Sequence, residues 1–297
     1  MPLPATEALH PDANGLDTLS DREALDRLLS GQEAALAAVR GALPDIAAGA
    51  AVMAEAIARG RRLVYGGAGS SALMAMADAM ELPGTYGISP ENLLVLMAGG
   101  MPGAPHLPGH VEDDTAEAQR AARLIRDGDA LVAVSASGST PYTVSLAQAA
   151  RARGARVIAL ANNAGAPLLE GAEVAIHVTT PPELIAGSTR MGAGTAQKAA
   201  LNLMSTLMAV RLGHVHDGMM VNVVADNEKL RARAIRIVAS IGDVSEDAAE
   251  KALQRADGAV KPAALIACGA TPDQAGALLS ETGQNLRAAL ARLRHPA

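Results

Sequence analysis

The sequence predicts a doubly wound α/β fold, in which a parallel sheet is covered by helices on both faces. Short apolar runs typical of buried strands alternate with longer stretches that have helical periodicity. Two of these strands end in turns rich in glycine and hydroxyl side chains, each directly before a helical stretch. At 297 residues, the chain is long enough for such a domain and a smaller appendage.

Two helices are expected ahead of the sheet. The first two dozen residues are rich in Pro, Asp and Asn and show no clear periodicity. Residues 21–39 and 44–58 then place apolar side chains at helical spacing. We therefore assign residues 1–60 to an N-terminal segment with two lead-in helices.

About five buried strands follow, within a domain that we expect to span residues 61–241. The helices between them include one that ends near Glu81, and two long ones at 192–211 and 222–241 close the domain. The expected strands are 62–65, 92–97, 130–134, 156–160 and 174–178.

The pattern changes beyond Gly242. Ser245 followed by two acidic residues is typical of a helix start, and Gly and Pro residues then divide the sequence into three short amphipathic helices that end near Leu293. Residues 242–297 are predicted to form a small three-helix module.

Composition excludes several classes of protein. The chain is 49% hydrophobic, carries a net charge of −6 and has no long basic run, so no nucleic-acid partner is expected. The single cysteine, Cys268, excludes an intramolecular disulfide and a zinc site built from cysteines. No export signal and no uncharged run of about 18 apolar residues is present, so we expect a soluble, cytoplasmic protein without membrane contact.

The two glycine-containing turns predict an anion site. Each follows a strand and opens a helix, whose free N–H groups and partial positive charge favour a phosphate. No Gly-Lys-Ser/Thr sequence follows, which disfavours a P-loop nucleotide site. The alternative is a pair of ordinary helix caps. The hydroxyl groups available to a phosphate are those of Ser70, Ser71, Ser135, Ser137, Ser139 and Thr140.

A third polar cluster precedes the helix at 192–211. Ser188 and Thr189 supply hydroxyl groups, and Arg190 could clamp an anion through two hydrogen bonds. Lys198 lies well inside the helix and suits a carboxylate partner or a subunit contact. The alternative is an ordinary capped helix start. The histidines are not spaced as metal ligands, so no metal is expected.

Two carboxylates are candidates for acid and base chemistry. Glu81 lies at an expected helix end beside Leu82 and Pro83, which would desolvate the carboxyl group and favour its neutral form. Glu112 stands next to two aspartates at a helix start, where acids also complement the helix dipole without any catalytic role. A carboxylate pair on either side of a sugar would suit general acid and base catalysis.

Several of these segments together resemble the N-acetylmuramic acid 6-phosphate etherase family, within the sugar-isomerase (SIS) superfamily. The resemblance covers nearly the whole chain, and its most specific part is the sequence from Gly187 to Lys198. It also includes Thr6-Glu7 and residues 17–20, and the C-terminal helices resemble the ubiquitin-associated-like module of that family. The matching segments are 65–71, 81–87, 137–142, 183–198 and 220–233.

The resemblance implies a homodimeric lyase that needs no cofactor, has active sites near the subunit interface and acts on an amino-sugar phosphate. It implies removal of D-lactate from C3 of N-acetylmuramic acid 6-phosphate, which leaves N-acetylglucosamine 6-phosphate. By position, Glu81 matches the essential acid and Glu112 the second catalytic carboxylate, which we expect to be the base. Ser70, Ser71, Ser135, Ser137 and Thr140 match the phosphate-binding hydroxyls. Glu183 falls within the matched sequence and is also expected to bind substrate.

Three positions depart from the family pattern where cations are usual. They are Leu73, Ser139 and Gly192. Each lost charged hydrogen bond would weaken binding by roughly 1.5 to 3 kcal/mol if nothing compensates. The departures leave open a related phosphosugar without the lactyl carboxylate. They also leave open a non-catalytic sugar-phosphate sensor that regulates a partner protein, or an aldose–ketose isomerase.

Overall fold

The chain forms two compact units. The structure, a computed structural model, describes residues 3–101, 103 and 109–295. Unit 1 comprises Met1–Met80 and Glu91–Thr206, and unit 2 comprises Glu81–Pro90 and Leu207–Ala297. Compact units and the domains of a family need not share boundaries, so the division into 1–60, 61–241 and 242–297 stays a prediction.

Unit 1 opens with short 3-10 turns (Ala5–Glu7, Pro11–Ala13 and Leu16–Thr18) and the two expected helices, α1 (Asp21–Ala38) and α2 (Leu43–Ala58). Ser20 and Glu23 begin α1 with reciprocal side-chain to backbone hydrogen bonds. The stretch Asp21–Ala58 is long and apolar enough to cross a membrane by length and composition alone. However, α2 buries Ile46, Ala50 and Met53, as the core helix of a globular protein does.

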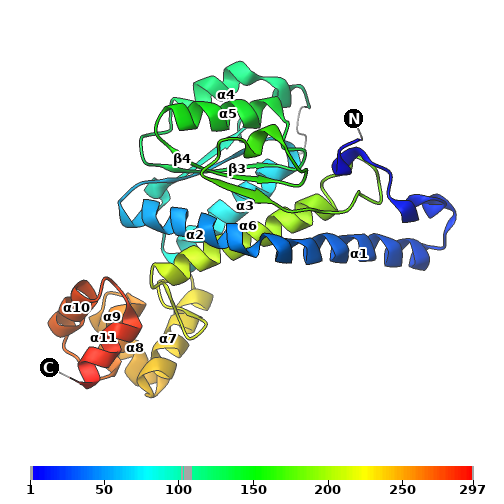
Figure 1. Cartoon of the computed structure of the whole chain (residues 1–297). Helices are drawn as coiled ribbons and strands as arrows, with labels where there is room; N and C mark the ends of the chain where they lie inside the picture. Colours follow the sequence, from blue (N-terminus) through cyan, green and yellow to red (C-terminus); the bar gives the residue numbers. More distant parts are fainter. Residues whose placement is uncertain (1–2, 102, 104–108, 296–297) are drawn as a thin grey trace. The chain divides into compact units, whose positions relative to one another are not determined.

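The sheet of unit 1 is the expected five-stranded parallel sheet. Its strands are β1 (Leu63–Gly67), β2 (Leu93–Met97), β3 (Ala130–Ser135), β4 (Arg156–Ala161) and β5 (Val174–His177), in the order β2-β1-β3-β4-β5. The helices that follow strands are α3 (Gly69–Tyr86), α4 (Thr115–Ala122), α5 (Pro141–Ala152) and α6 (Gly192–Arg211). Figure 1 shows α4 and α5 on one side of the sheet and α2 on the other, so the fold is doubly wound.

Aliphatic side chains fill both faces of this sheet. Val64, Leu131 and Val157 share one core cluster with Tyr142 and Leu146 of α5. On α2, a Cβ at Gly49 would lie 2.5 Å from the sulfur of Met204 and 3.3 Å from Ile158, so helix and sheet approach closely there. Because successive strand residues point to opposite faces, a nearly continuous apolar sequence is what a sheet covered on both sides requires.

Unit 2 consists mainly of helices. A two-stranded antiparallel ribbon, β6 (Val215–His216) and β7 (Met219–Met220), precedes α7 (Glu228–Gly242). Three helices are predicted after Gly242, but the described residues up to 295 form four: α8 (Glu246–Arg255), α9 (Val260–Ala267), α10 (Pro272–Glu281) and α11 (Leu286–Arg294). The unpredicted break lies where Gly283 and Gln284 adopt positive φ and Asn285 caps α11.

Two other helix boundaries also differ from the expectation. The helix α3 does not end near Glu81 but continues through Pro83 to Tyr86. The helix expected from residue 222 begins at Glu228, because the Asn227 side chain accepts a hydrogen bond from the Leu230 N–H and caps it. Apolar periodicity locates both helices, and local capping determines where they begin and end.

Candidate active site

The strand order places the two polar turns side by side. From β1 the chain continues to β2 on one side, and from β3 it continues to β4 on the other, so the order reverses between β1 and β3. A crevice forms at the carboxyl ends of the strands at such a point, and it is the usual ligand site of open α/β sheets. The turns after β1 and β3 both lie there, as the sequence predicts.

Glycines allow these turns to approach closely. A Cβ at Gly67 would lie only 2.8 Å from the carbonyl oxygen of Val134 on β3. Gly138 has a φ of +66°, and a Cβ there would lie 2.4 Å from the Cβ of Ala166. A larger residue at either position would force the backbone apart.

The hydroxyl groups of the turn after β3 form one cluster. The Ser135 Oγ lies 2.9 Å from the Thr140 Oγ1, which lies 3.4 Å from the Ser137 Oγ. The Ser139 N–H donates to the Ser137 Oγ at 3.2 Å. Thr140 begins α5 without a side-chain cap. Clustered hydroxyls beside an uncapped helix start have the chemistry of an oxyanion site.

The turn after β1 is joined by Glu112. Ser70 and Ser71 lie in the first turn of α3, which begins at Gly69. A Cβ at Gly69 would lie 2.6 Å from the Glu112 Oε1, so this carboxylate covers the start of α3. Burial, and then the neighbouring Asp113 carboxylate, raise the pKa of Glu112. The structure therefore brings one predicted catalytic carboxylate to the predicted phosphate turn after β1.

The acids after Glu112 have different surroundings. Asp114 accepts a hydrogen bond from the Glu117 N–H at 2.7 Å and caps α4. This is the ordinary role of an acid at a helix start, and it needs no catalytic function. Asp113 is exposed.

Glu81 lies inside α3 and not at its end. The prediction that it lies at a helix end and is desolvated is wrong, because α3 continues past it and its side chain is exposed in the single chain. It belongs to unit 2, whereas Glu112 belongs to unit 1. Their pairing across a substrate therefore stays a prediction.

The third cluster is organised by Glu183. Its two carboxylate oxygens accept hydrogen bonds from the N–H groups of Gly192 and Ala193, each at 2.8 Å, so that Glu183 caps α6. Glu183 is buried, whereas Arg190 and Lys198 are exposed and have no ion-pair partner among the described residues. Ser188 and Thr189 are partly buried in the loop before α6.

Comparison with known proteins gives the family. Residues 32–162 match the SIS domain family. The N-acetylmuramic acid 6-phosphate etherase of Streptomyces coelicolor is 43% identical over 291 residues, which cover 96% of this chain and 93% of the relative. The chain belongs to the N-acetylmuramic acid 6-phosphate etherase family. The etherase of Burkholderia lata is 42% identical over 294 residues, covering 97% of this chain and 96% of the relative.

A solved structure shares the fold at low identity. The chain described as E. coli CFT073 c3406 in complex with A5P has a TM-score of 0.50 and 12% identity, and the match covers 67% of this chain and 97% of that one. The family predicted from the sequence motifs is confirmed by the etherase relatives.

One departure from the etherase pattern has a structural reason. A Cβ at Gly192 would lie 3.0 Å from the Glu183 Oε2 and 3.1 Å from the Ala35 Cβ, so a long side chain would crowd the cap of α6. Ser139 is exposed, and Leu73 is partly buried on α3. Nothing in the structure explains the residue types at these two positions.

Asn163 was not predicted as a site residue, and it holds the turn after β3 in place. Its Nδ2 donates to the Ser137 carbonyl oxygen at 3.2 Å and to the Thr6 Oγ1 at 2.9 Å. The Thr6 N–H donates back to the Asn163 Oδ1 at 3.3 Å. The available signal was its position just after a strand, at the carboxyl edge of the sheet. Thr6, part of the etherase resemblance, therefore has a positioning role.

Proposed function

We propose that this chain cleaves the C3 D-lactyl ether of N-acetylmuramic acid 6-phosphate to N-acetylglucosamine 6-phosphate and D-lactate. The observation that carries the proposal is 43% identity to an etherase along 96% of the chain. Hydroxyl groups at the reversal of strand order support it, because they suit the 6-phosphate. We assign phosphate binding to Ser70, Ser71, Ser135, Ser137 and Thr140.

The reaction proceeds by elimination and rehydration. Opening of the pyranose gives a C1 aldehyde, which acidifies the proton on C2. Glu112 takes this proton, and the C3–O bond breaks while Glu81 protonates the departing lactate oxygen. Water then adds across the C2–C3 double bond and restores the C3 hydroxyl. The raised pKa of Glu112 brings the base closer to neutrality, where proton transfer is most effective.

Assembly and location are part of the same proposal. We assign the protein to the cytoplasm as a homodimer with active sites near the subunit interface. Three leucines on one face of α1, Leu25, Leu29 and Leu36, are half or more exposed in the single chain. Their spacing of four and seven residues puts them on one side of the helix, as a subunit contact requires.

Isotope exchange tests the reaction and the two roles together. We would incubate the protein with N-acetylmuramic acid 6-phosphate in deuterated water and follow D-lactate and the C2 proton. The unchanged protein should release D-lactate. Glu81→Gln should exchange the C2 proton but release no lactate, and Glu112→Gln should lose both. Glu91→Gln, at an exposed acid of unit 1, serves as the control and should behave like the unchanged chain.

Two results would contradict the proposal in different ways. Binding of the phosphosugar without any lactate release would favour the sensor considered above. Lactate release by Glu81→Gln at nearly the unchanged rate would refute the assignment of the acid while leaving the reaction intact.

A further inference from the structure

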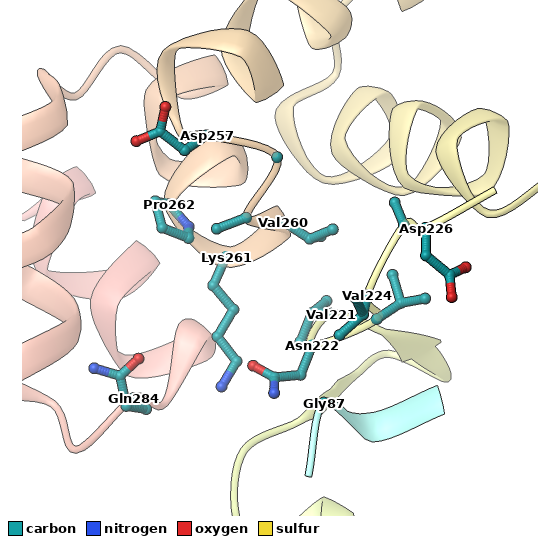
Figure 2. A pocket seen from close by; sticks show the side chains of 14 residues that line it. Gly87, Val221, Asn222, Val224, Asp226, Asp257, Val260, Lys261, Pro262 and Gln284 are labelled. Atoms are coloured by element: carbon teal, nitrogen blue, oxygen red, sulfur yellow. The ribbon is translucent and has the colours of Figure 1, made fainter. Parts of the chain in front are cut away.

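Unit 2 contains a pocket that the proposed reaction does not use. Its volume is about 500 Å³, and it is lined by the start of α9, the segment before α7, Gly87 and Gln284 (Figure 2). All of these residues belong to unit 2. None of them is assigned to the phosphate turns or to the catalytic carboxylates.

A buried lysine faces this pocket. Lys261 is only 4% exposed, and among the described residues its ammonium group has neither a carboxylate nor a hydrogen-bond partner. Burial lowers the pKa of Lys261 to about 8, so the group is still mostly protonated at neutral pH. Buried lysines are almost always paired, because an isolated charge in an apolar site is costly. Lys261 lines the pocket, so its ammonium group is available there to pair with an anion.

The start of α9 adds a second positive feature to the same pocket. Ala259 begins this helix without a side-chain cap. The N–H groups of Val260 and Lys261 have no acceptor in the part of the chain that the structure describes, and Pro262 has no N–H. Unpaired N–H groups at a helix start attract negative charge, and the first turn of α9 lines the pocket.

The charges around the pocket limit what this anion can be. Asp226 and Asp257 line its rim, are exposed, and point away from the end of Lys261 in Figure 2. Burial, and then the nearby Lys261, lower the pKa of His214 to about 4, so His214 is neutral at pH 7. One cation thus faces the interior while two acids stand at the rim. A singly charged anion can pair with the one cation, and the two carboxylates at the rim repel it less than they repel a doubly charged phosphate.

We propose that this pocket binds a small organic monocarboxylate, whose carboxylate pairs with the Lys261 ammonium group. The side-chain amide of Asn222, whose Nδ2 donates to the Tyr86 carbonyl oxygen at 2.8 Å, points toward the end of Lys261 and can hydrogen-bond a polar group of the ligand (Figure 2). The side chains of Val221, Val224 and Val260 supply apolar contact for its carbon chain. The inference does not depend on the lyase reaction.

Acetate titration of the full chain tests the site. The titration would be followed by amide NMR at constant ionic strength with chloride as the balancing ion. We expect saturable shifts at Val260 and Lys261, with affinity at least tenfold weaker in Lys261→Met. Lys251→Met should leave the affinity unchanged, because Lys251 is an exposed lysine of the same unit that pairs with Asp247 outside the pocket.

The unchanged protein supplies an independent measurement if Lys261→Met does not fold. Acetate should bind several-fold more weakly at pH 9.5 than at pH 6.5, because Lys261 loses its proton over this range while His214 stays neutral. Equal affinity at the two pH values, or equal affinity in folded Lys261→Met, would overturn the proposal. Tighter binding of inorganic phosphate than of acetate would overturn the choice of a carboxylate.

Discussion

Among the site residues, Glu112 predicts how the rate of the reaction depends on pH. A base must be ionised to take the C2 proton, so kcat should fall as the pH falls through the raised pKa of Glu112. Asp113→Asn removes the neighbouring charge and lowers that pKa, which should move the acid limb of the kcat profile to lower pH. D-lactate release between about pH 4 and pH 8 measures the limb. An unmoved limb in Asp113→Asn, with Glu91→Gln as control, would contradict the role of Glu112.

Ser137 allows binding to be separated from stability. Its hydroxyl lies in the cluster with Ser135 and Thr140 and is only partly buried, so its main expected partner is the ligand phosphate. Ser137→Ala should weaken binding of N-acetylglucosamine 6-phosphate by at least about tenfold, because one hydrogen bond to a charged group contributes roughly 1.5 to 3 kcal/mol. Calorimetric titration measures this.

The control for Ser137 lies in the same region of unit 1. Ser145 on α5 is buried, and its hydroxyl accepts a hydrogen bond from the Gln119 side chain, away from the phosphate turns. Ser145→Ala should therefore lower the melting temperature and leave the affinity unchanged. The opposite pattern in the two variants would refute the assignment of the phosphate site.

At the scale of elements, the cap of α6 predicts that Glu183 acts mainly on stability. Glu183→Ala leaves two buried N–H groups unpaired and should lower the free energy of unfolding by about 2 to 4 kcal/mol. Glu183→Gln keeps one acceptor oxygen and should lower the free energy of unfolding by less than Glu183→Ala does. Urea denaturation measures the free energy of unfolding of both variants.

Asp26→Ala, which removes an exposed ion pair with Arg22 on α1, serves as the control and should change the free energy of unfolding by less than about 0.5 kcal/mol. If Glu183→Ala lowered the free energy of unfolding as little as Asp26→Ala does, the capping role of Glu183 would be contradicted.

Some elements of the fold could be predicted from the sequence, and others could not. Strand 130–134 and the turn after it were predictable, because a buried parallel strand and a helix start both have local signatures. The capping of α6 by Glu183 and the contact between Asn163 and Thr6 depend on chain segments brought together by the fold. Asn163 and Thr6 are 157 residues apart in the sequence, and no local pattern reveals such a contact. The continuation of α3 through Pro83 overrides a local helix-breaking signal.

For the whole molecule, the apolar face of α1 predicts the assembly. Another side of this helix includes Ala35, which is 1% exposed, whereas Leu25 and Leu29 are 63% and 57% exposed in the single chain. Light scattering should give about twice the chain mass of 30.0 kDa. The double variant Leu25→Glu, Leu29→Glu places four charges at the contact of two subunits and should give a monomer at micromolar concentration.

The chain provides a matched control for this variant. Leu124 is 57% exposed and lies just after α4, so Leu124→Glu introduces the same charge elsewhere on unit 1 and should stay dimeric. Because the leucines of α1 are exposed in each subunit, their replacement should hardly change the folding of the single chain. If active sites lie near the subunit interface, the monomeric variant should release D-lactate far more slowly than Leu124→Glu. A monomeric unchanged protein, or a dimeric double variant, would show that the face of α1 is not the subunit contact.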